Sequence, residues 1–238
     1  MKISIIIPVY KETISLVQTL KALADIRLLV PFEILVVDGE KKASTLSFLR
    51  TAPEAHHWMP DPGIRMIASA RGRGIQMNAG ARAATGDLFL FLHADTRPSQ
   101  AGMDQMIFGR QTSGPLFCGA FDLAIDSPKP VFRIIERTAS LRSRLTRIPY
   151  GDQGIFISKD LFNRVGGFPD LPLMEDVGLM AAVKKKRIPP FFPGQTILTS
   201  ARRWETRGII STTLKNWGFI FLYAMGVSPW KLEKWYYS

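Results

Sequence analysis

The sequence DLFLFLHADT occupies residues 87–96 and decides the fold class. Residues 87–92 are almost entirely leucine and phenylalanine, which predicts a β-strand covered on both faces. His93 and Asp95 follow directly, so polar side chains come at the carboxyl end of a buried strand. Ligands of open α/β sheets bind outside the carboxyl ends of the parallel strands. The stretch therefore predicts an α/β protein with a binding site at this edge of its sheet.

Three further strands are predicted before this one, with a helix after each. Apolar, β-branched runs place the strands at 3–9, 32–37 and 64–68. The helices are predicted at 13–29, 41–50 and 73–84, and the first of them has Leu16, Leu20 and Leu23 on one face. Strands that alternate with helices form a parallel sheet with right-handed crossovers.

The regular alternation fades after Asp95. We predict strands at 116–125, 154–158 and 196–199, and helices at 131–146, 160–165, 174–186 and 207–225. No internal repeat, low-complexity tract or linker interrupts the chain. The expected fold is α/β, with a mostly parallel central sheet, flanking helices and a mixed C-terminal half. We expect a single domain over 1–238, divided into halves 1–95 and 96–238.

Net charge, cysteine content and the length of the apolar runs indicate which partners and which cellular compartment to expect. The 238 residues carry a net charge of +11, which favours anionic partners. Basic residues recur inside predicted helices rather than in a tail, so a disordered nucleic-acid-binding arm is a poor description. The one cysteine excludes an intrachain disulfide and fits a reducing compartment. The apolar run at 217–227 is shorter than the roughly 20 residues that span a bilayer, so we expect a cytoplasmic protein.

Polar and flexible residues follow all four predicted strands. Because the carboxyl ends of parallel strands share one edge, we expect these residues to converge there. The candidates are Pro8, Val9, Tyr10 and Glu12 after the first strand, Asp38 after the second, Arg71 after the third, and His93, Ala94 and Asp95 after the fourth. Gln76 and Asn78 belong to the helix that Arg71 precedes.

Two of these strand ends suggest contacts with a nucleotide. Glycines and arginines at 71–74, before a helix, suit a diphosphate through free N–H groups and forked donors. A solvated basic turn is the alternative. Asp38 is placed to bond a base or ribose, as strand-end acids do in dinucleotide folds, or simply to cap the next helix.

Asp95 is the candidate metal ligand. Mg²⁺ and Mn²⁺ prefer oxygen ligands and share them with substrate phosphates, so one carboxylate can suffice. His93 lies two residues earlier, on the same face of an extended chain. It is either a second ligand or a structural hydrogen-bonding group. His56 and His57 lie in a loop flanked by prolines, and we predict that they face solvent.

The C-terminal half contributes a candidate base and a candidate phosphate-binding cluster. Glu175 and Asp176 begin a predicted helix, where acids are favourable for electrostatic reasons alone. The functional interpretation makes Asp176 a general base, with Glu175 paired to a nearby cation. Arg202, Arg203 and Trp204 suit phosphate pairing with aromatic stacking, or form a surface cation–π cluster.

Taken in order, these residues resemble the family-2 glycosyltransferases, which share the GT-A fold. The matching pieces are 4–12, 36–39, 78–87, 92–95, 174–176 and 202–204. The resemblance implies a nucleotide-diphosphate sugar donor, most simply a UDP-sugar, bound by residues 1–95, and a hydroxyl acceptor facing 96–238. It also implies Mn²⁺ or Mg²⁺ on Asp95, Asp176 as the base and inversion at the anomeric carbon.

Residues 71–80 together with 93–96 are similar to a bacterial subgroup of arsenosugar-biosynthesis or radical-SAM-associated glycosyltransferases. That subgroup implies a small-molecule acceptor. Three positions depart from the family pattern. His93 replaces the first Asp of Asp-x-Asp, Glu40 replaces a serine, and the Gln of the last element is missing, which argues against processive polymer synthesis.

Other classes remain to be weighed against this interpretation. A nucleic-acid-binding protein fits the charge, but the chain lacks a recognised motif, so we expect no nucleic-acid partner. A sugar nucleotidyltransferase needs a glycine-rich loop after the first strand, where Pro8 stands. A degenerate, binding-only transferase and a transferase with a membrane-lipid acceptor stay as alternatives. The basic helix at 129–147 and the aromatic segment at 217–237 fit peripheral contact with the inner membrane face, a homodimer interface, or ordinary packing.

Overall fold

The computed structural model describes the chain except for residues 52–63 and 238. The prediction for His56 and His57 lies outside the described residues. Among the described residues, no helix is long and apolar enough to cross a bilayer.

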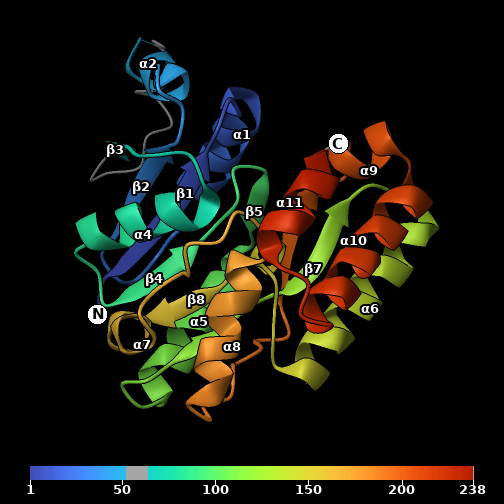
Figure 1. Ribbon diagram of the computed structural model, residues 1–238. Coiled ribbons are helices and arrows are strands. Elements are labelled where there is room, and N and C mark those ends of the chain that lie inside the picture. The colour runs from blue at the N-terminus through green and yellow to red at the C-terminus, as the bar shows by residue number, and fades with distance from the viewer. Residues whose placement is uncertain (52–63, 238) are drawn as a thin grey trace.

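A six-stranded sheet forms the centre of the molecule, in the order β3-β2-β1-β4-β8-β6 (Figure 1). Four strands are parallel: β1 (Ile3–Val9), β2 (Phe32–Asp38), β3 (Ile64–Ala68) and β4 (Leu88–Phe91). The other two, β8 (Phe156–Ser158) and β6 (Cys118–Gly119), extend the sheet in antiparallel pairings. The α/β fold with a mostly parallel central sheet is thus confirmed, and both halves of the chain contribute strands to it.

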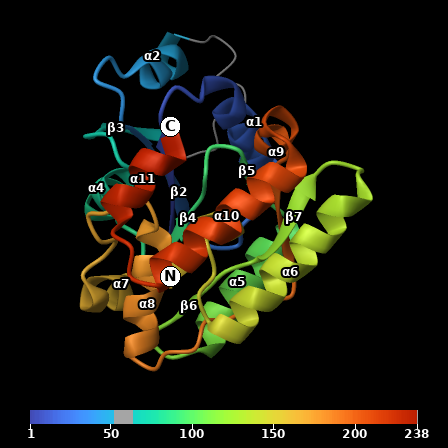
Figure 2. The same cartoon turned by 45° about the vertical axis from the view of Figure 1, so that its right-hand side comes forward.

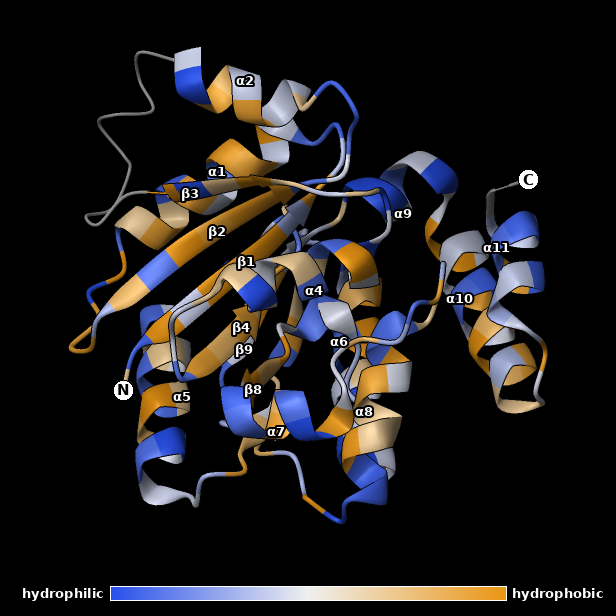
Figure 3. Cartoon of the chain, turned by 60° about the vertical axis from the view of Figure 1, so that its left-hand side comes forward, coloured by the Kyte–Doolittle hydropathy of each residue, from blue (hydrophilic) through white to orange (hydrophobic). Residues whose placement is uncertain are grey.

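Helices cover both faces of this sheet because its strands are apolar on both sides (Figure 3). Side chains of β1 alternate, so that Ile5 and Ile7 pack on one face and Ile6 on the other. The first face is covered by α1 (Thr13–Ala24), α2 (Ser44–Thr51) and α5 (Gln100–Thr112). The second is covered by α4 (Arg73–Ala83), α7 (Lys159–Val165) and α8 (Glu175–Lys185).

A smaller sheet lies beside the large one, in the order β5-β9-β7. Its strands are β5 (Thr96–Pro98), β9 (Thr196–Ser200) and β7 (Asp122–Asp126), and α6 (Pro130–Thr146) packs against it. The chain then continues through α9 (Arg202–Arg207), α10 (Ile209–Ala224) and α11 (Pro229–Tyr237). A one-turn 3-10 helix, η1 (Gly151–Gln153), precedes β8.

Two predicted elements differ from the observed ones, and three observed α-helices were not predicted. The strand predicted at 116–125 is two strands in different sheets, β6 and β7. The backbone packs so tightly there that a Cβ on Gly119 would clash with the Phe191 carbonyl oxygen. The helix predicted at 207–225 is α10, which begins at Ile209, and a separate short helix, α9, precedes it and ends before Gly208, whose φ is 87°. Helices α5, α9 and α11 were not predicted.

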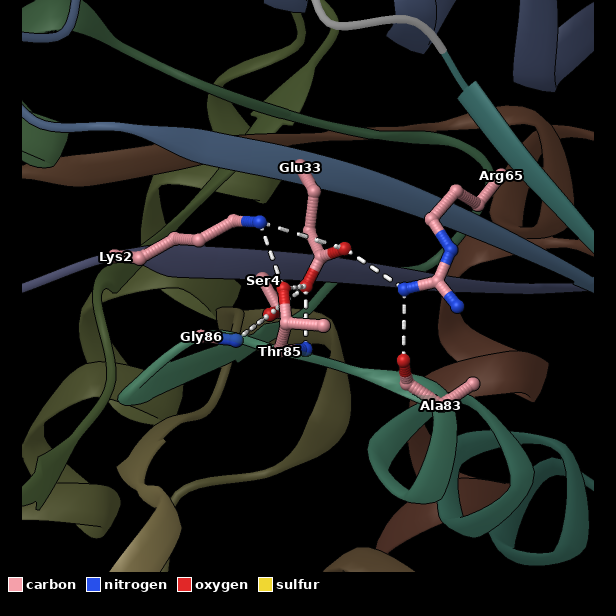
Figure 4. Close-up of polar contacts among 7 residues, drawn as sticks. All are labelled: Lys2, Ser4, Glu33, Arg65, Ala83, Thr85 and Gly86. Carbon is pink, nitrogen blue, oxygen red and sulfur yellow. Dashed lines mark hydrogen bonds and ion pairs between the residues drawn. The ribbon is translucent and has the colours of Figure 1, made fainter.

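A buried carboxylate joins the amino ends of four chain segments (Figure 4). Glu33 accepts hydrogen bonds from Ser4 Oγ at 2.7 Å, from the Thr85 main-chain N–H at 2.6 Å and from Arg65 Nη1 at 2.9 Å. Burial opposes ionisation of this carboxyl, but these hydrogen bonds outweigh it and lower the pKa of Glu33 to about 2. The cluster lies at the edge of the sheet opposite to the strand ends that were expected to form a site.

Candidate active site

Two cavities of about 690 Å³ each meet at the carboxyl ends of the parallel strands. The strand-end cavity is lined by the loops after β1, β3 and β4 and by α9 and α11. The helix-side cavity is lined by η1, the start of α8, and the helices α6 and α10. Both cavities are lined by Arg73, His93, Asp95, Arg203 and Tyr236, which therefore form a shared wall.

Most of the candidate residues line one of these cavities. The strand-end cavity contains Pro8, Val9, Tyr10, Glu12, Arg71, Gln76, Ala94, Asp95, Arg202 and Arg203. The helix-side cavity contains Asp176 and Trp204 together with His93, Asp95 and Arg203. Asp95 and Asp176 thus share a cavity, although they are 81 positions apart in the sequence.

Three candidates line neither cavity. Asp38 is fully buried, and its carboxylate accepts main-chain N–H groups from Glu40 at 2.9 Å and Leu46 at 3.4 Å. Asn78 forms a two-way pair with the main chain of Phe168, accepting from its N–H at 2.9 Å and donating to its carbonyl at 2.8 Å. Glu175 is buried and forms a 2.9 Å ion pair with Arg73 Nε. Arg73 is thus the nearby cation expected for Glu175.

The end of β1 is held by α4. The Gln76 amide nitrogen donates to the Val9 and Val37 carbonyl oxygens, both at 2.8 Å, and so ties the ends of β1 and β2 together. A Cβ on Gly39 would meet the Gln76 side chain at 2.8 Å, so this position requires glycine. Tyr10 lies beyond the tied strand end, with the Arg71 guanidinium 4.6 Å from its ring centroid.

Asp95 is held at the junction of the two cavities by the small sheet. Its carbonyl oxygen accepts from the Ser200 N–H at 3.2 Å, while β5 begins at the next residue. Glu12 is close by: burial and the Asp95 carboxylate raise the pKa of Glu12, and Arg202, 4.0 Å away, opposes that rise. Burial and the guanidinium groups of Arg73 and Arg203 lower the pKa of His93 to about 3, so the imidazole is neutral at physiological pH.

Asp176 lies opposite, at the start of α8. One carboxylate oxygen accepts from the Gly151 N–H at 2.7 Å, and the other accepts from the Val177 N–H at 2.8 Å. A Cβ on Gly151 would meet His93 Nε2 at 2.8 Å and Asp176 Oδ2 at 3.4 Å. Glycine at 151 therefore allows the β4 end, η1 and α8 to meet.

The sequence analysis missed the residues around η1. Asp152 lines the helix-side cavity, and burial, reinforced by Asp176 and Asp95, raises its pKa to about 6. Burial also raises the pKa of Tyr150 to about 12, and the Arg142 guanidinium lies 3.1 Å from the centroid of its ring. No local feature of the sequence marked these residues. They reach the same edge as the residues after β4 because β8 is antiparallel to β4.

Trp204 connects this site to the second sheet. It is buried against Phe132, with an edge-to-face arrangement at 6.0 Å between ring centroids. Its indole N–H has no hydrogen-bond partner among the described residues, although Trp204 lines the helix-side cavity.

The residues of the site can bind a divalent cation only if phosphate oxygens or water complete its coordination shell. Among the described residues, no three histidine, cysteine, aspartate or glutamate side chains are grouped as a complete metal site. Asp95 offers one accessible carboxylate, and the neutral His93 imidazole lies beside it. Mg²⁺ and Mn²⁺ commonly take one or two carboxylates plus phosphate oxygens and water, so this donor set fits a cation that arrives with a diphosphate.

The sequence matches a model of a known protein family. The family model described as glycosyl transferase family 2 matches residues 4–168. The chain belongs to glycosyl transferase family 2. The matched part of the chain runs from β1 through Phe168. No curated protein matches the sequence.

Solved structures share the family-2 fold at low sequence identity. S. aureus TarS (residues 1–349) is 17% identical with a TM-score of 0.63, covering 84% of this chain and 61% of that one. The mannosyltransferase PcManGT from Pyrobaculum calidifontis, in complex with GDP-Man and Mn²⁺, is 20% identical with a TM-score of 0.59. That match covers 82% of this chain and 56% of PcManGT. This family-2 chain thus spans less than two thirds of either solved chain.

Proposed function

We propose that the protein transfers a sugar from a nucleotide-diphosphate donor, a UDP-sugar, to an acceptor hydroxyl with the help of a divalent cation. The observation that carries this proposal is that Asp95 and Asp176 line one cavity, with Asp95 also lining the second. TarS has been solved with UDP and with UDP-GlcNAc, and PcManGT with GDP-Man and Mn²⁺, which supports a nucleotide-sugar donor here.

The donor occupies the strand-end cavity in this proposal. Tyr10 and Arg71 contact the nucleotide, while Arg73, Arg202 and Arg203 provide cations for the diphosphate. Asp95, with His93 beside it, is the residue that would hold Mn²⁺ or Mg²⁺. When bound there, the cation supplies Lewis-acid stabilisation of the negative charge on the leaving diphosphate.

The acceptor enters from the helix-side cavity. Its hydroxyl oxygen forms a bond to the anomeric carbon while the bond from that carbon to the diphosphate oxygen breaks. The electron pair of the broken bond leaves with the diphosphate, and Asp176 takes the hydroxyl proton. Because donor and acceptor approach from different cavities, the attack comes from the face opposite the leaving group, which inverts the anomeric carbon.

The donor proposal is tested by thermal unfolding with UDP-, GDP- and other nucleotide sugars, each with and without Mn²⁺. A ligand at a hundredfold excess over its dissociation constant stabilises the fold by about 2.7 kcal/mol. We expect this stabilisation for one nucleotide only, and we expect it to require Mn²⁺. The absence of a shift with every nucleotide sugar would contradict the proposal.

Membership of the arsenosugar-biosynthesis or radical-SAM-associated subgroup remains our proposal from residues 71–80 and 93–96. The small-molecule acceptor that this subgroup implies is proposed on the same grounds, with a membrane-lipid acceptor as the alternative.

A further inference from the structure

The helix-side cavity combines a polar part with an apolar part. Its polar part is formed by Asp95, Asp152 and Asp176, from the β4 end, η1 and α8. Its apolar part comes from α6 and α10, including Ile135, Ala139, Trp217, Ile220 and Phe221. A small polar acceptor would make use of the first part only. An acceptor with a hydroxyl head and an apolar tail would fill both.

The two helices of the apolar part, α6 and α10, lie on the side of the molecule remote from β3, with the helix-side cavity between them (Figures 1 and 2). Large apolar side chains line the outer face of α10 along its whole length. They recur every three or four residues, which places them on one helical face. These residues are Ile210, Leu214, Trp217, Phe221 and Met225, and each is between 58% and 73% exposed.

Helix α6 carries a similar stripe in Ile134, Leu141 and Leu145, which are 57% to 75% exposed. The eight side chains of both stripes are called the α6–α10 rim below. Trp217 and Phe221 belong to the rim and also line the helix-side cavity. The cavity therefore borders an exposed apolar surface. Exposed apolar side chains gathered in this way mark a contact with a partner or a membrane.

The charge of the segments that carry the rim selects among partners. Residues 129–147, which include α6, contain six Lys and Arg and one Glu, and α10 contains Lys215 and no acidic residue. These two segments hold six of the eleven surplus positive charges of the chain. Two copies of such a face would repel each other, and a nucleic acid would leave the apolar stripes uncovered. An anionic lipid surface matches both the charge and the apolar side chains.

We propose that the α6–α10 rim docks on an anionic lipid bilayer, and that the helix-side cavity takes the apolar tail of an amphiphilic acceptor held in that bilayer. The docking of the rim stands on its own observations. The part that concerns the acceptor rests on the proposed glycosyl transfer, because the acceptor hydroxyl must reach Asp176.

Docking is tested by co-sedimentation with vesicles of phosphatidylglycerol or of phosphatidylcholine. We expect the wild-type protein to bind phosphatidylglycerol vesicles at least tenfold more tightly. The triple variant Leu141→Glu, Leu145→Glu, Leu214→Glu should lose at least tenfold of this affinity, because it places charges in the rim without touching either cavity. The matched control Leu29→Glu, Phe108→Glu alters exposed apolar residues outside the rim and should bind like the wild type.

Three results would overturn docking. The first is the absence of wild-type binding to phosphatidylglycerol vesicles. The second is equal binding by the triple variant and the wild type, which would mean adsorption by charge alone. The third is a dimer in analytical ultracentrifugation that the triple variant dissociates, without vesicle binding. Circular dichroism checks that the triple variant folds; if it does not, the single variant Leu145→Glu, expected to weaken binding severalfold, takes its place.

The acceptor cavity is tested by tryptophan quenching with 12-bromododecanol, because bromine quenches tryptophan only at short range. We expect 12-bromododecanol to quench at concentrations at least tenfold below those of 2-bromoethanol. The variant Trp217→Phe should reduce this quenching, with the rest coming from Trp204, which also lines the cavity. The control Trp230→Phe removes a tryptophan that lines only the strand-end cavity, and its quenching should stay.

Equal quenching by both alcohols, or unchanged quenching in Trp217→Phe, would overturn the acceptor part. Neither the vesicle nor the quenching readout involves the donor. If the quenching result fails while a nucleotide sugar still stabilises the protein against thermal unfolding, the lipid acceptor is rejected. If only the stabilisation by nucleotide sugars is absent, the proposed donor is rejected.

Discussion

The main-chain N–H of Gly151 donates a 2.7 Å hydrogen bond to Asp176 Oδ2. This bond joins the turn before β8 to the first residues of α8, across 25 positions of sequence. Together with the donor from Val177, it leaves both carboxylate oxygens of Asp176 held by main-chain groups. A carboxylate so positioned faces the cavity in one orientation, as a proton acceptor requires.

Asp176→Asn should lower the transfer rate by roughly 10²–10⁴-fold, because the amide cannot take a proton from the acceptor. Nucleotide affinity should stay within about twofold of the wild-type value, since Asp176 lines only the helix-side cavity. Release of the nucleotide diphosphate and calorimetry measure the two quantities. Asp160→Asn, on the exposed first turn of α7, is the control. Full activity of Asp176→Asn would refute its role as the base.

Asp95→Ala should abolish the Mn²⁺-dependent part of UDP binding, because the variant lacks the carboxylate that would hold the cation. Calorimetric titrations of UDP with and without Mn²⁺ should then give the same affinity. Asp104→Ala, an exposed position on α5, should behave like the wild type. If Mn²⁺ strengthens UDP binding equally in Asp95→Ala, the cation binds elsewhere.

Arg73→Met should destabilise the fold by roughly 3 kcal/mol, because it leaves the buried Glu175 carboxylate without its cation. The double variant Arg73→Met, Glu175→Gln should recover most of this loss, since no charge is then buried alone. Urea denaturation at pH 7 measures the free energy of unfolding of both. Equal stability of the single and double variants would show that the ion pair does not hold this region.

Glu33→Gln should lower the free energy of unfolding at pH 7 by about 3 kcal/mol, which corresponds to a pKa of 4.5 in the unfolded chain and about 2 in the fold. Because the folded pKa is depressed, this stabilisation is complete above pH 4.5 and is lost as the pH falls towards 2. Wild type and variant should therefore converge in acid. Glu205→Gln, which removes an exposed ion pair to Lys129, should cost less than about 1 kcal/mol.

Asp152→Asn should raise the free energy of unfolding at pH 8 by roughly 1–3 kcal/mol. The folded pKa of about 6 lies above the ordinary 3.8, so the buried charge reduces stability as the pH rises through this interval. The gain should vanish near pH 3.5, where Asp152 is protonated in both states. Thermal unfolding across pH 3.5–8 measures the difference. A variant less stable than the wild type at pH 8 would show that the charged form is favoured.

The parallel part of the fold was predictable because it depends on local signals. Strands β1 to β4 are continuous apolar runs, and the residues that follow them meet at one edge by topology alone. Eight of the candidates that line the strand-end cavity come from this rule: Pro8, Val9, Tyr10, Glu12, Arg71, His93, Ala94 and Asp95. Asp38, which is fully buried, shows the limit of this rule. Packing decides whether an acid at a strand end lines a cavity or lies in the interior, and the periodicity of the sequence does not encode that packing.

The elements and site residues that were not predicted depend on contacts between residues far apart in the sequence. Helix α5 contains Gly102 and Gly109, which are poor helix formers, yet both are packed against aromatic rings, of Phe121 and Phe191. Asp152 was missed because only the direction of β8 brings η1 to the site, and strand direction is set by pairing partners far away in the sequence.

The Glu33 cluster and the two cavities lie at opposite ends of the same strands, so the stabilisation that this cluster contributes is separated in space from the site. Laboratory evolution towards heat tolerance could work on Ser4, Arg65 and Thr85 without reshaping substrate preference. Conversely, a library aimed at new sugars could vary the opposite edge while the Glu33 hydrogen bonds stay intact.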